Sequence, residues 1–242
     1  MTIVDFYEYD HGFCESTIYE NIYQPEFINS VSSLCITFVG IFGLIYNSRY
    51  QPNISMVYNT FIINGICSCM YHYTHYIGWG LADRFSMILM VVYCYNICIQ
   101  YLNMNNLIKI ICISFIVSLL TVTGLNNETL FNILFGVFLI SIIVCINMAR
   151  LSLTYQRYAL GKKGIQYIVL AGVLWIITEM FCNHIWIMKY MVGHAFWHIG
   201  VSIGGYYITL TFAGEQNMYM KYKFGLPYIC DIPYIPNNKF EV

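Results

Sequence analysis

The chain has 242 residues, of which 59% are hydrophobic and only 10% are charged, and its formal net charge at pH 7 is −1. Soluble domains carry about 25% charged residues, so most of this chain is expected to face lipid or other helices. A nucleic-acid partner is excluded, because no basic stripe is available to neutralise phosphates. Residues 1–25 are acidic and lack the apolar core of a signal peptide, so none is expected.

The distribution of apolar residues divides the chain into three regions. Residues 1–26 form a polar, acidic amino-terminal arm, residues 27–214 form a membrane domain, and residues 215–242 form a polar tail that we expect to be irregular. The membrane domain contains seven apolar runs, at 27–46, 55–76, 83–102, 107–125, 129–149, 165–187 and 190–212. Each is close to the ~20 residues that cross a bilayer as a helix. Because lipid cannot hydrogen-bond a bare backbone, the predicted fold is an all-α integral membrane protein, a seven-transmembrane helix bundle.

Turn residues indicate where these runs end, and the positions of Lys and Arg indicate how the runs are oriented in the membrane. Gly78 with Gly80, and the segment Gly161 to Gly164, are typical of separators. Lysines and arginines gather on one side of a seven-span chain, and the other side keeps only Arg84 and Lys189. The positive-inside rule therefore predicts a lumenal amino terminus and a cytosolic carboxyl terminus.

Two histidines open the last run. His194 and His198 are four residues apart, so they lie on one face of a helix, one turn above the other. On the predicted topology the second run ends on the same side of the membrane with Ser68 and His72, and the third run begins there with Asp83. Ionisable residues in membrane spans are rare and are candidates for function. The topology thus predicts an intramembrane site at which three helix ends meet.

Three neutral imidazoles with one open position are typical of catalytic zinc. Zinc lowers the pKa of a bound water to about 7. Asp83 is suited to take the proton of that water and deliver it to a leaving group, and Ser68 is suited to donate a hydrogen bond to an oxyanion. These residues predict hydrolysis of an amide or ester in a lipid that enters between helices.

Each of these residues also has a structural interpretation. The two histidines of the last run can be core residues that donate to backbone carbonyls. Ser68 can bond the backbone carbonyl one turn back, and Asp83 can cap the start of the third helix. His75 follows His72 by three residues and is a competing ligand.

Four motifs are shared with one family. The first motif is a Ser, a His, an Asp and a Met at fixed spacing, and this chain has Ser68, His72, Asp83 and Met87 at that spacing. The second motif is His-Ala-x-Trp-His, which is found at residues 194–198. Two further patches are Phe13-Cys14-Glu15 with Glu26-Phe27-Ile28-Asn29, and Trp175 with Phe181-Cys182. Over about residues 12–207 the chain resembles the alkaline ceramidases, seven-span zinc amidases whose superfamily also contains the adiponectin-type receptors.

The resemblance implies a function and a set of site residues. It implies hydrolysis of the amide of ceramide to a sphingoid base and a fatty acid, in an endomembrane such as the endoplasmic reticulum or the Golgi. It implies zinc held by His72, His194 and His198, with Ser68 and Asp83 as catalytic residues. It also implies a calcium site and a disulfide in the arm, with these residues: Phe13, Glu15, Thr17 and Glu26 for calcium, and Cys14 with Cys182 for the disulfide.

The chain departs from the family pattern at several positions. Gly12 and Thr17 stand where the calcium motif has Asp and Asn, so only Glu15 and Glu26 keep carboxylates there. Calcium prefers several hard oxygen ligands, so calcium binding is weakened, lost or shifted to Asp10. Arg84 replaces an acidic residue next to Asp83 and is a candidate for altered substrate preference. No departure removes a predicted zinc ligand.

Two other functions remain open from the sequence. One is a related lipid hydrolase of the superfamily, for example an enzyme that remodels lipid anchors. The other is a non-catalytic receptor with structural zinc, which would need a fourth protein ligand such as His75. The sequence leaves acyl-chain preference and oligomeric state open.

Overall fold

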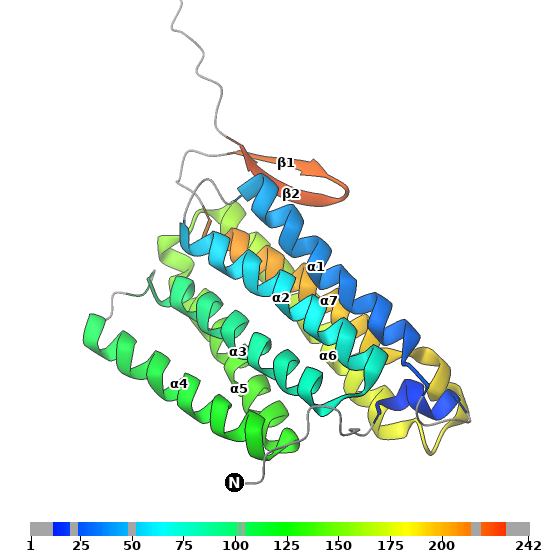
Figure 1. The fold of residues 1–242 in the computed structure, drawn as a ribbon. Helices are drawn as coiled ribbons and strands as arrows, with labels where there is room; N and C mark the ends of the chain where they lie inside the picture. The colour runs from blue at the N-terminus through cyan, green and yellow to red at the C-terminus, as the bar shows by residue number, and fades with distance from the viewer. Residues whose placement is uncertain are drawn as a thin grey trace, which may run out of the picture.

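The computed structural model describes residues 12–19, 24–47, 52–100, 102, 105–213 and 219–230. Within these residues the chain forms a bundle of seven long α-helices, with short 3-10 helices between them and a β-hairpin after the last (Figure 1). The elements in chain order are η1 (Cys14–Ile18), α1 (Phe27–Asn47), α2 (Pro52–Thr74), α3 (Ile77–Gln100), α4 (Asn106–Asn126), α5 (Glu128–Met148), η3 (Ala149–Ser152), α6 (Tyr155–Phe181), η4 (Trp186–Met191), α7 (Gly193–Thr211), β1 (Tyr219–Lys223) and β2 (Leu226–Cys230). Asp10, Arg49 and residues 231–242 lie outside the described part.

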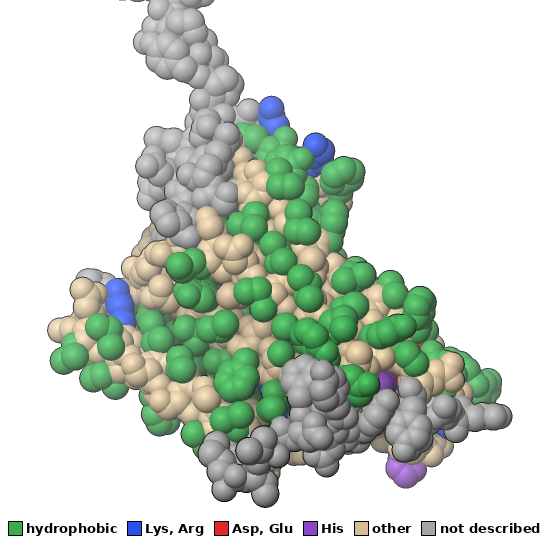
Figure 2. Space-filling view, in the orientation of Figure 1, with side chains coloured by type: hydrophobic (Ala, Val, Ile, Leu, Met, Phe, Trp, Pro, Cys, Tyr) green, Lys and Arg blue, Asp and Glu red, His purple; other side chains and the backbone are tan. Residues whose placement is uncertain are grey.

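Five of the described helices are long and apolar enough to cross a membrane, namely α1, α3, α4, α5 and α6. Large apolar side chains on their outer faces are exposed, among them Phe115 (64%) and Leu170 (71%). Apolar side chains are also spread over the face seen in Figure 2, where the larger Lys and Arg groups lie near the upper and left margins. This surface suits lipid, and the chain is a multi-pass membrane protein of the all-α class.

The helices α2 and α7 lie at the centre of the bundle. The structure packs α7 against both α1 and α6, and α2 against α1 and α3, while α4 and α5 lie further out (Figure 1). Most residues of α7 are buried along its whole length. Because α2 and α7 carry polar residues that point inward, they fall outside the group of helices that qualify as spans by composition. Each of the seven predicted apolar runs nevertheless contains most of one α-helix, or falls largely within one. Gly78 and Gly80, which were predicted to separate two helices, lie inside α3.

The start of α6 differs from the sequence expectation. The segment Gly161 to Gly164 was predicted to separate two helices, but it lies inside α6, which begins at Tyr155 after a cap from the Thr154 side chain. Packing explains the difference. A Cβ atom on Gly164 would lie 2.6 Å from the carbonyl oxygen of Gly204 on α7, so the absent side chain lets the two backbones approach.

The tail also differs from expectation. Residues 219–230 form an antiparallel hairpin, so the prediction of an irregular tail is wrong there. Its turn residues Phe224 and Gly225 have φ of 52° and 78°, which is the backbone that a tight hairpin turn requires. The backbone N–H of Ile229 donates to Asn47 Oδ1 at 3.0 Å, which fixes the hairpin to the end of α1.

We predict that Gly204→Ala destabilises the bundle. The new methyl group would lie 2.5 Å from Ile168 and 2.7 Å from the Gly164 carbonyl oxygen, so α6 and α7 must separate. Overpacking of this kind costs about 1–3 kcal/mol. The measurement is the melting temperature in detergent. Gly136→Ala on α5 is the matched control, since nothing lies within 4 Å of its new methyl group, and equal melting of the two variants would contradict the packing argument.

Candidate metal centre and active-site cavity

Three histidines from two distant parts of the chain meet inside the bundle. His72 lies in the last turn of α2, and His194 and His198 lie in the first two turns of α7. One ring nitrogen from each lies within 4.8 Å of the others, and all three side chains are buried. The three histidines that were predicted to meet therefore form a group that could hold one metal ion.

Two of the imidazoles are oriented by neighbours on the amino-terminal side of the bundle. His72 Nδ1 lies 2.7 Å from the Oε2 atom of Glu26, a carboxylate that is itself fully buried. His198 Nδ1 lies 2.9 Å from the hydroxyl of Ser32 and 3.2 Å from that of Ser33. With Nδ1 engaged in this way, each ring keeps Nε2 for a metal, which is the arrangement usual for metal-binding histidines.

The third imidazole is held by aromatic rings. His194 stacks on Phe13 with ring centroids 4.1 Å apart and meets Trp175 edge-on at 5.2 Å. Its Nδ1 atom is buried and has no hydrogen-bond partner within the described residues. A buried polar atom without a partner is costly, and a metal ion would relieve that cost. The three imidazoles thus fit a bound metal.

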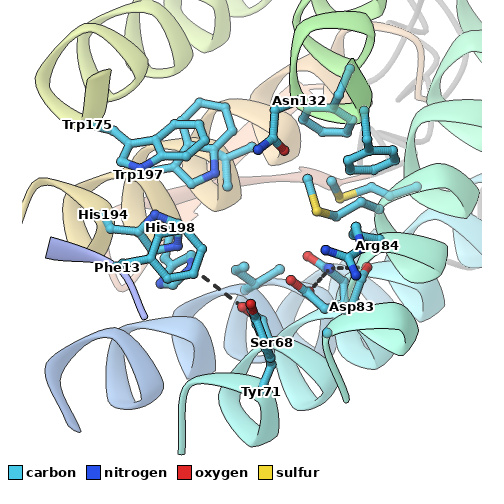
Figure 3. A pocket seen from close by; sticks show the side chains of 18 residues that line it. Phe13, Ser68, Tyr71, Asp83, Arg84, Asn132, Trp175, His194, Trp197 and His198 are labelled. Atoms are coloured by element: carbon cyan, nitrogen blue, oxygen red, sulfur yellow. Dashed lines mark hydrogen bonds between the residues drawn. The ribbon is translucent and has the colours of Figure 1, made fainter. Parts of the chain in front are cut away.

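A cavity opens next to the histidines, with about 640 Å³ of space between the atoms when its open mouth is included. His194, His198, Ser68 and Asp83 line it together, and Figure 3 shows Ser68 between the histidines and Asp83. The Ser68 hydroxyl lies 3.5 Å from His198 Nε2 and 3.0 Å from the Ser33 hydroxyl. Ser68 is therefore directed toward the metal centre, and the interpretation of Ser68 as a backbone-bonding residue is not supported.

Asp83 lies inside α3, which begins at Ile77, so the alternative that it caps the helix is wrong. The side-chain amide of Asn64 donates to Asp83 Oδ1 at 2.8 Å and lies 3.0 Å from the Ser86 hydroxyl. Asn64 is a site residue that was not predicted from the sequence. It precedes Ser68 by four residues and thus shares its helix face, which is a signal that could have identified it.

Comparisons of the sequence with known proteins show its family. The family model described as Ceramidase matches residues 9–236. This chain belongs to the ceramidase family. It is also similar to alkaline ceramidase 3 of Mus musculus, with 25% identity over 229 residues that cover 87% of this chain and 85% of the mouse protein. The predicted resemblance to the alkaline ceramidases is confirmed.

In this ceramidase-family chain His75 is not part of the three-histidine group. It follows the end of α2 with a left-handed backbone, φ 55°, and its N–H donates to the carbonyl of Tyr71 at 2.7 Å. The interpretation of His75 as a competing ligand is therefore not supported by the geometry.

The residues predicted for calcium are engaged elsewhere. Glu15 accepts hydrogen bonds from the backbone N–H groups of Ile28 (2.7 Å) and Asn29 (2.8 Å), so its carboxylate stabilises the amino-terminal end of α1. The Thr17 hydroxyl donates to the carbonyl oxygen of Cys14 at 2.7 Å. In these contacts the Glu15 carboxylate and the Thr17 hydroxyl bond to different parts of the backbone and do not converge on one cation position.

Glu26 completes this arrangement. One carboxylate oxygen accepts from the backbone N–H of Phe13, and the other contacts His72 and the side-chain amide of Asn29. Burial raises the pKa of the Glu26 carboxyl, but the contacts with His72 and Asn29 outweigh it and hold the pKa below its usual value. Calcium takes 6–8 oxygen ligands. The described residues of the ceramidase arm offer two carboxylates already occupied by N–H donors, which does not fit calcium, and Asp10 lies outside the described part.

Cys14 and Cys182 are both buried, and their side chains lie within hydrogen-bond reach of each other. Burial and a hydrogen bond with Cys182 raise the pKa of the Cys14 thiol. The Cys14 backbone N–H also donates to Glu179 Oε2 at 2.9 Å, which attaches η1 to the end of α6. The fold thus brings together the two residues of the predicted disulfide, and that disulfide remains a prediction.

We predict that Glu26→Gln weakens metal binding by about 10–100-fold, because His72 loses the carboxylate that orients its ring and raises its basicity. The measurement is metal affinity by competition with a chelator. Glu15→Gln is the matched control, since Glu15 is also a buried arm carboxylate but contacts the backbone of α1 instead of a histidine. Equal losses in both variants would show that the arm acts only by docking.

Proposed function

We propose that this chain hydrolyses the amide bond of ceramide to a sphingoid base and a free fatty acid, with zinc held by His72, His194 and His198. The observation that carries the proposal is the group of three buried imidazoles beside a cavity lined by Ser68 and Asp83, in a member of the ceramidase family. Three neutral imidazoles with no fourth protein ligand are typical of catalytic zinc.

Zinc, when bound, would supply Lewis-acid activation of water and of the substrate carbonyl. Asp83 accepts the proton of the attacking water and then delivers it to the amide nitrogen as the C–N bond breaks, so that the amine leaves neutral. The hydrogen bond from Asn64 holds the Asp83 carboxylate in place for both transfers.

Ser68 stabilises the oxyanion that develops on the substrate carbonyl. Its hydroxyl is directed at the centre by contact with Ser33 on α1, so little reorganisation is needed during the reaction. Ser33 also contacts His198 Nδ1. Ser33 therefore has two roles: it orients the proposed metal ligand His198 and the proposed oxyanion donor Ser68.

The rest of the cavity suits a lipid. Its apolar lining comes from several helices: Ile36, Met87, Met90, Phe131, Phe135 and Val201. Such a surface accommodates acyl chains, and the polar end next to the histidines takes the amide.

We further propose that all seven helices cross the membrane. The helices α2 and α7 have 23 and 19 residues and pack beside α1 and α6, which qualify as spans. At 1.5 Å per residue 19 residues reach ~29 Å, close to the hydrocarbon thickness. The positive-inside rule then supports a lumenal amino terminus and a cytosolic carboxyl terminus. The resemblance to the alkaline ceramidases supports an endomembrane location, in the endoplasmic reticulum or Golgi.

The alternative of a non-catalytic receptor with structural zinc would need a further protein ligand. The three-histidine group contains no fourth His, Cys, Asp or Glu among the described residues, which favours an open position. The related lipid hydrolases differ from ceramidases in substrate, so the test has to distinguish substrates directly.

The test is mass spectrometry of products after the purified protein is incubated with ceramides and, separately, with phospholipids. We expect a sphingoid base and a fatty acid from ceramide and no product from phospholipid. Release of fatty acid from phospholipids alone would assign the chain to another hydrolase activity.

We predict that Asp83→Asn keeps the metal and lowers kcat by about 10²–10⁴-fold, since the substituted amide cannot carry the proton. His198→Ala should lose metal and turnover together, because a ligand is removed. Metal content and single-turnover rates of both variants make the comparison. Unchanged kcat in Asp83→Asn would assign the proton transfer to another group.

A further inference from the structure

A hollow lined by cations lies far from the histidines. Arg150, Lys162 and Lys163 line it together with Tyr155 and Tyr158, and its volume is about 1280 Å³. We call these five residues the basic hollow. It lies where η3 leads into α6.

The basic hollow belongs to the opposite end of the bundle from the metal centre. Lys163 lies 4.9 Å from the ring centroid of Tyr207 on α7. Tyr207 follows His194 by 13 positions along α7, which at 1.5 Å per residue is roughly 20 Å. The hollow is therefore a separate feature that the proposed hydrolysis does not use.

Among the described residues, the neighbours of the three cations are aromatic. Arg150 lies 5.6 Å from the ring centroid of Tyr158, and Lys162 lies 6.0 Å from the same centroid. Within the described ranges none of Arg150, Lys162 and Lys163 forms an ion pair, and no Asp or Glu lines the hollow. Three like charges around one cavity repel each other, so a bound anion would lower the electrostatic free energy of this region.

The surroundings favour an anion that carries acyl chains. Leu151, which follows Arg150, is 96% exposed, and Met148, two residues before Arg150, is 64% exposed. Tyr155, which lines the hollow, is 86% exposed. Apolar and tyrosine side chains at this level of a membrane protein suit the boundary between acyl chains and headgroups. A freely dissolved phosphate has no acyl chains that could contact these apolar side chains.

We propose that the basic hollow binds the phosphate headgroup of an anionic phospholipid. Basic pockets between transmembrane helices on the cytosolic side are suited to such headgroups, and juxtamembrane cations contribute through the negative surface of the bilayer. The proposal rests on the membrane location of the chain and is independent of ceramide hydrolysis.

The test uses the full-length protein in mixed micelles, with fluorescent phosphatidylserine as the probe and phosphatidylcholine as the uncharged comparison. We expect Arg150→Gln with Lys162→Gln to weaken phosphatidylserine binding about 30-fold, since each cation near an anionic surface contributes about 5-fold. The matched control is Lys109→Gln in the first turn of α4, which removes one charge outside the hollow and should weaken binding less than Lys162→Gln alone.

Three outcomes would overturn the proposal. Phosphatidylcholine could bind as tightly as phosphatidylserine, Lys109→Gln could weaken binding as much as Lys162→Gln alone, or millimolar inorganic phosphate could displace the lipid completely. The last result would assign the hollow to a soluble anion. Lys162→Gln alone keeps the test valid if the double variant does not fold, because Lys162 is exposed and its removal opens no cavity in the core.

Discussion

The contact between Glu26 and His72 joins the segment before α1 to the end of α2, and the metal centre depends on it. The Glu26 carboxylate accepts from the His72 ring, while the Glu26 backbone N–H donates to the His72 carbonyl oxygen at 3.0 Å. The same carboxylate also accepts from the backbone of Phe13, whose ring stacks on His194. The buried residue Glu26 therefore couples the position of the amino-terminal arm to the orientation of the His72 and His194 rings.

Burial of three imidazoles in a membrane bundle also explains the distribution of polarity among the helices. Polar groups in an apolar interior are costly unless they are hydrogen-bonded, so they must gather where they can satisfy one another. The hydroxyls of Ser32 and Ser33, the amide of Asn64 and the carboxylate of Asp83 all face this centre from α1, α2 and α3. The outer helices can then be apolar, whereas α2 and α7 are too polar to qualify as membrane spans by composition.

Much of the fold and of the site was predictable from the sequence, for identifiable reasons. Helix periodicity alone places His194 and His198 on one face, and a topology with alternating directions brings His72, Ser68 and Asp83 to the same level. The start of α6 was missed because glycines at a close helix crossing look like turn residues in a sequence. In the same way, the hairpin at 219–230 is too short and polar to stand out from an irregular tail.

The role of Glu26 could not be read from the sequence. It stands in a motif that implies calcium ligands, and nothing in the chain order indicates that residue 26 lies beside residue 72. Only the packing of α1 against α2 makes that contact. The hydrogen bonds that the Glu15 carboxylate accepts from the backbone at the start of α1 were not predicted either. Long-range contacts decide both cases, and local patterns do not record them.

X-ray absorption at the zinc edge of the purified protein tests the central claim most directly, since it counts the ligand atoms around the ion. The account predicts three imidazole nitrogens and one oxygen that does not come from a protein side chain. A sulfur ligand, a fourth imidazole or the absence of bound zinc would contradict it.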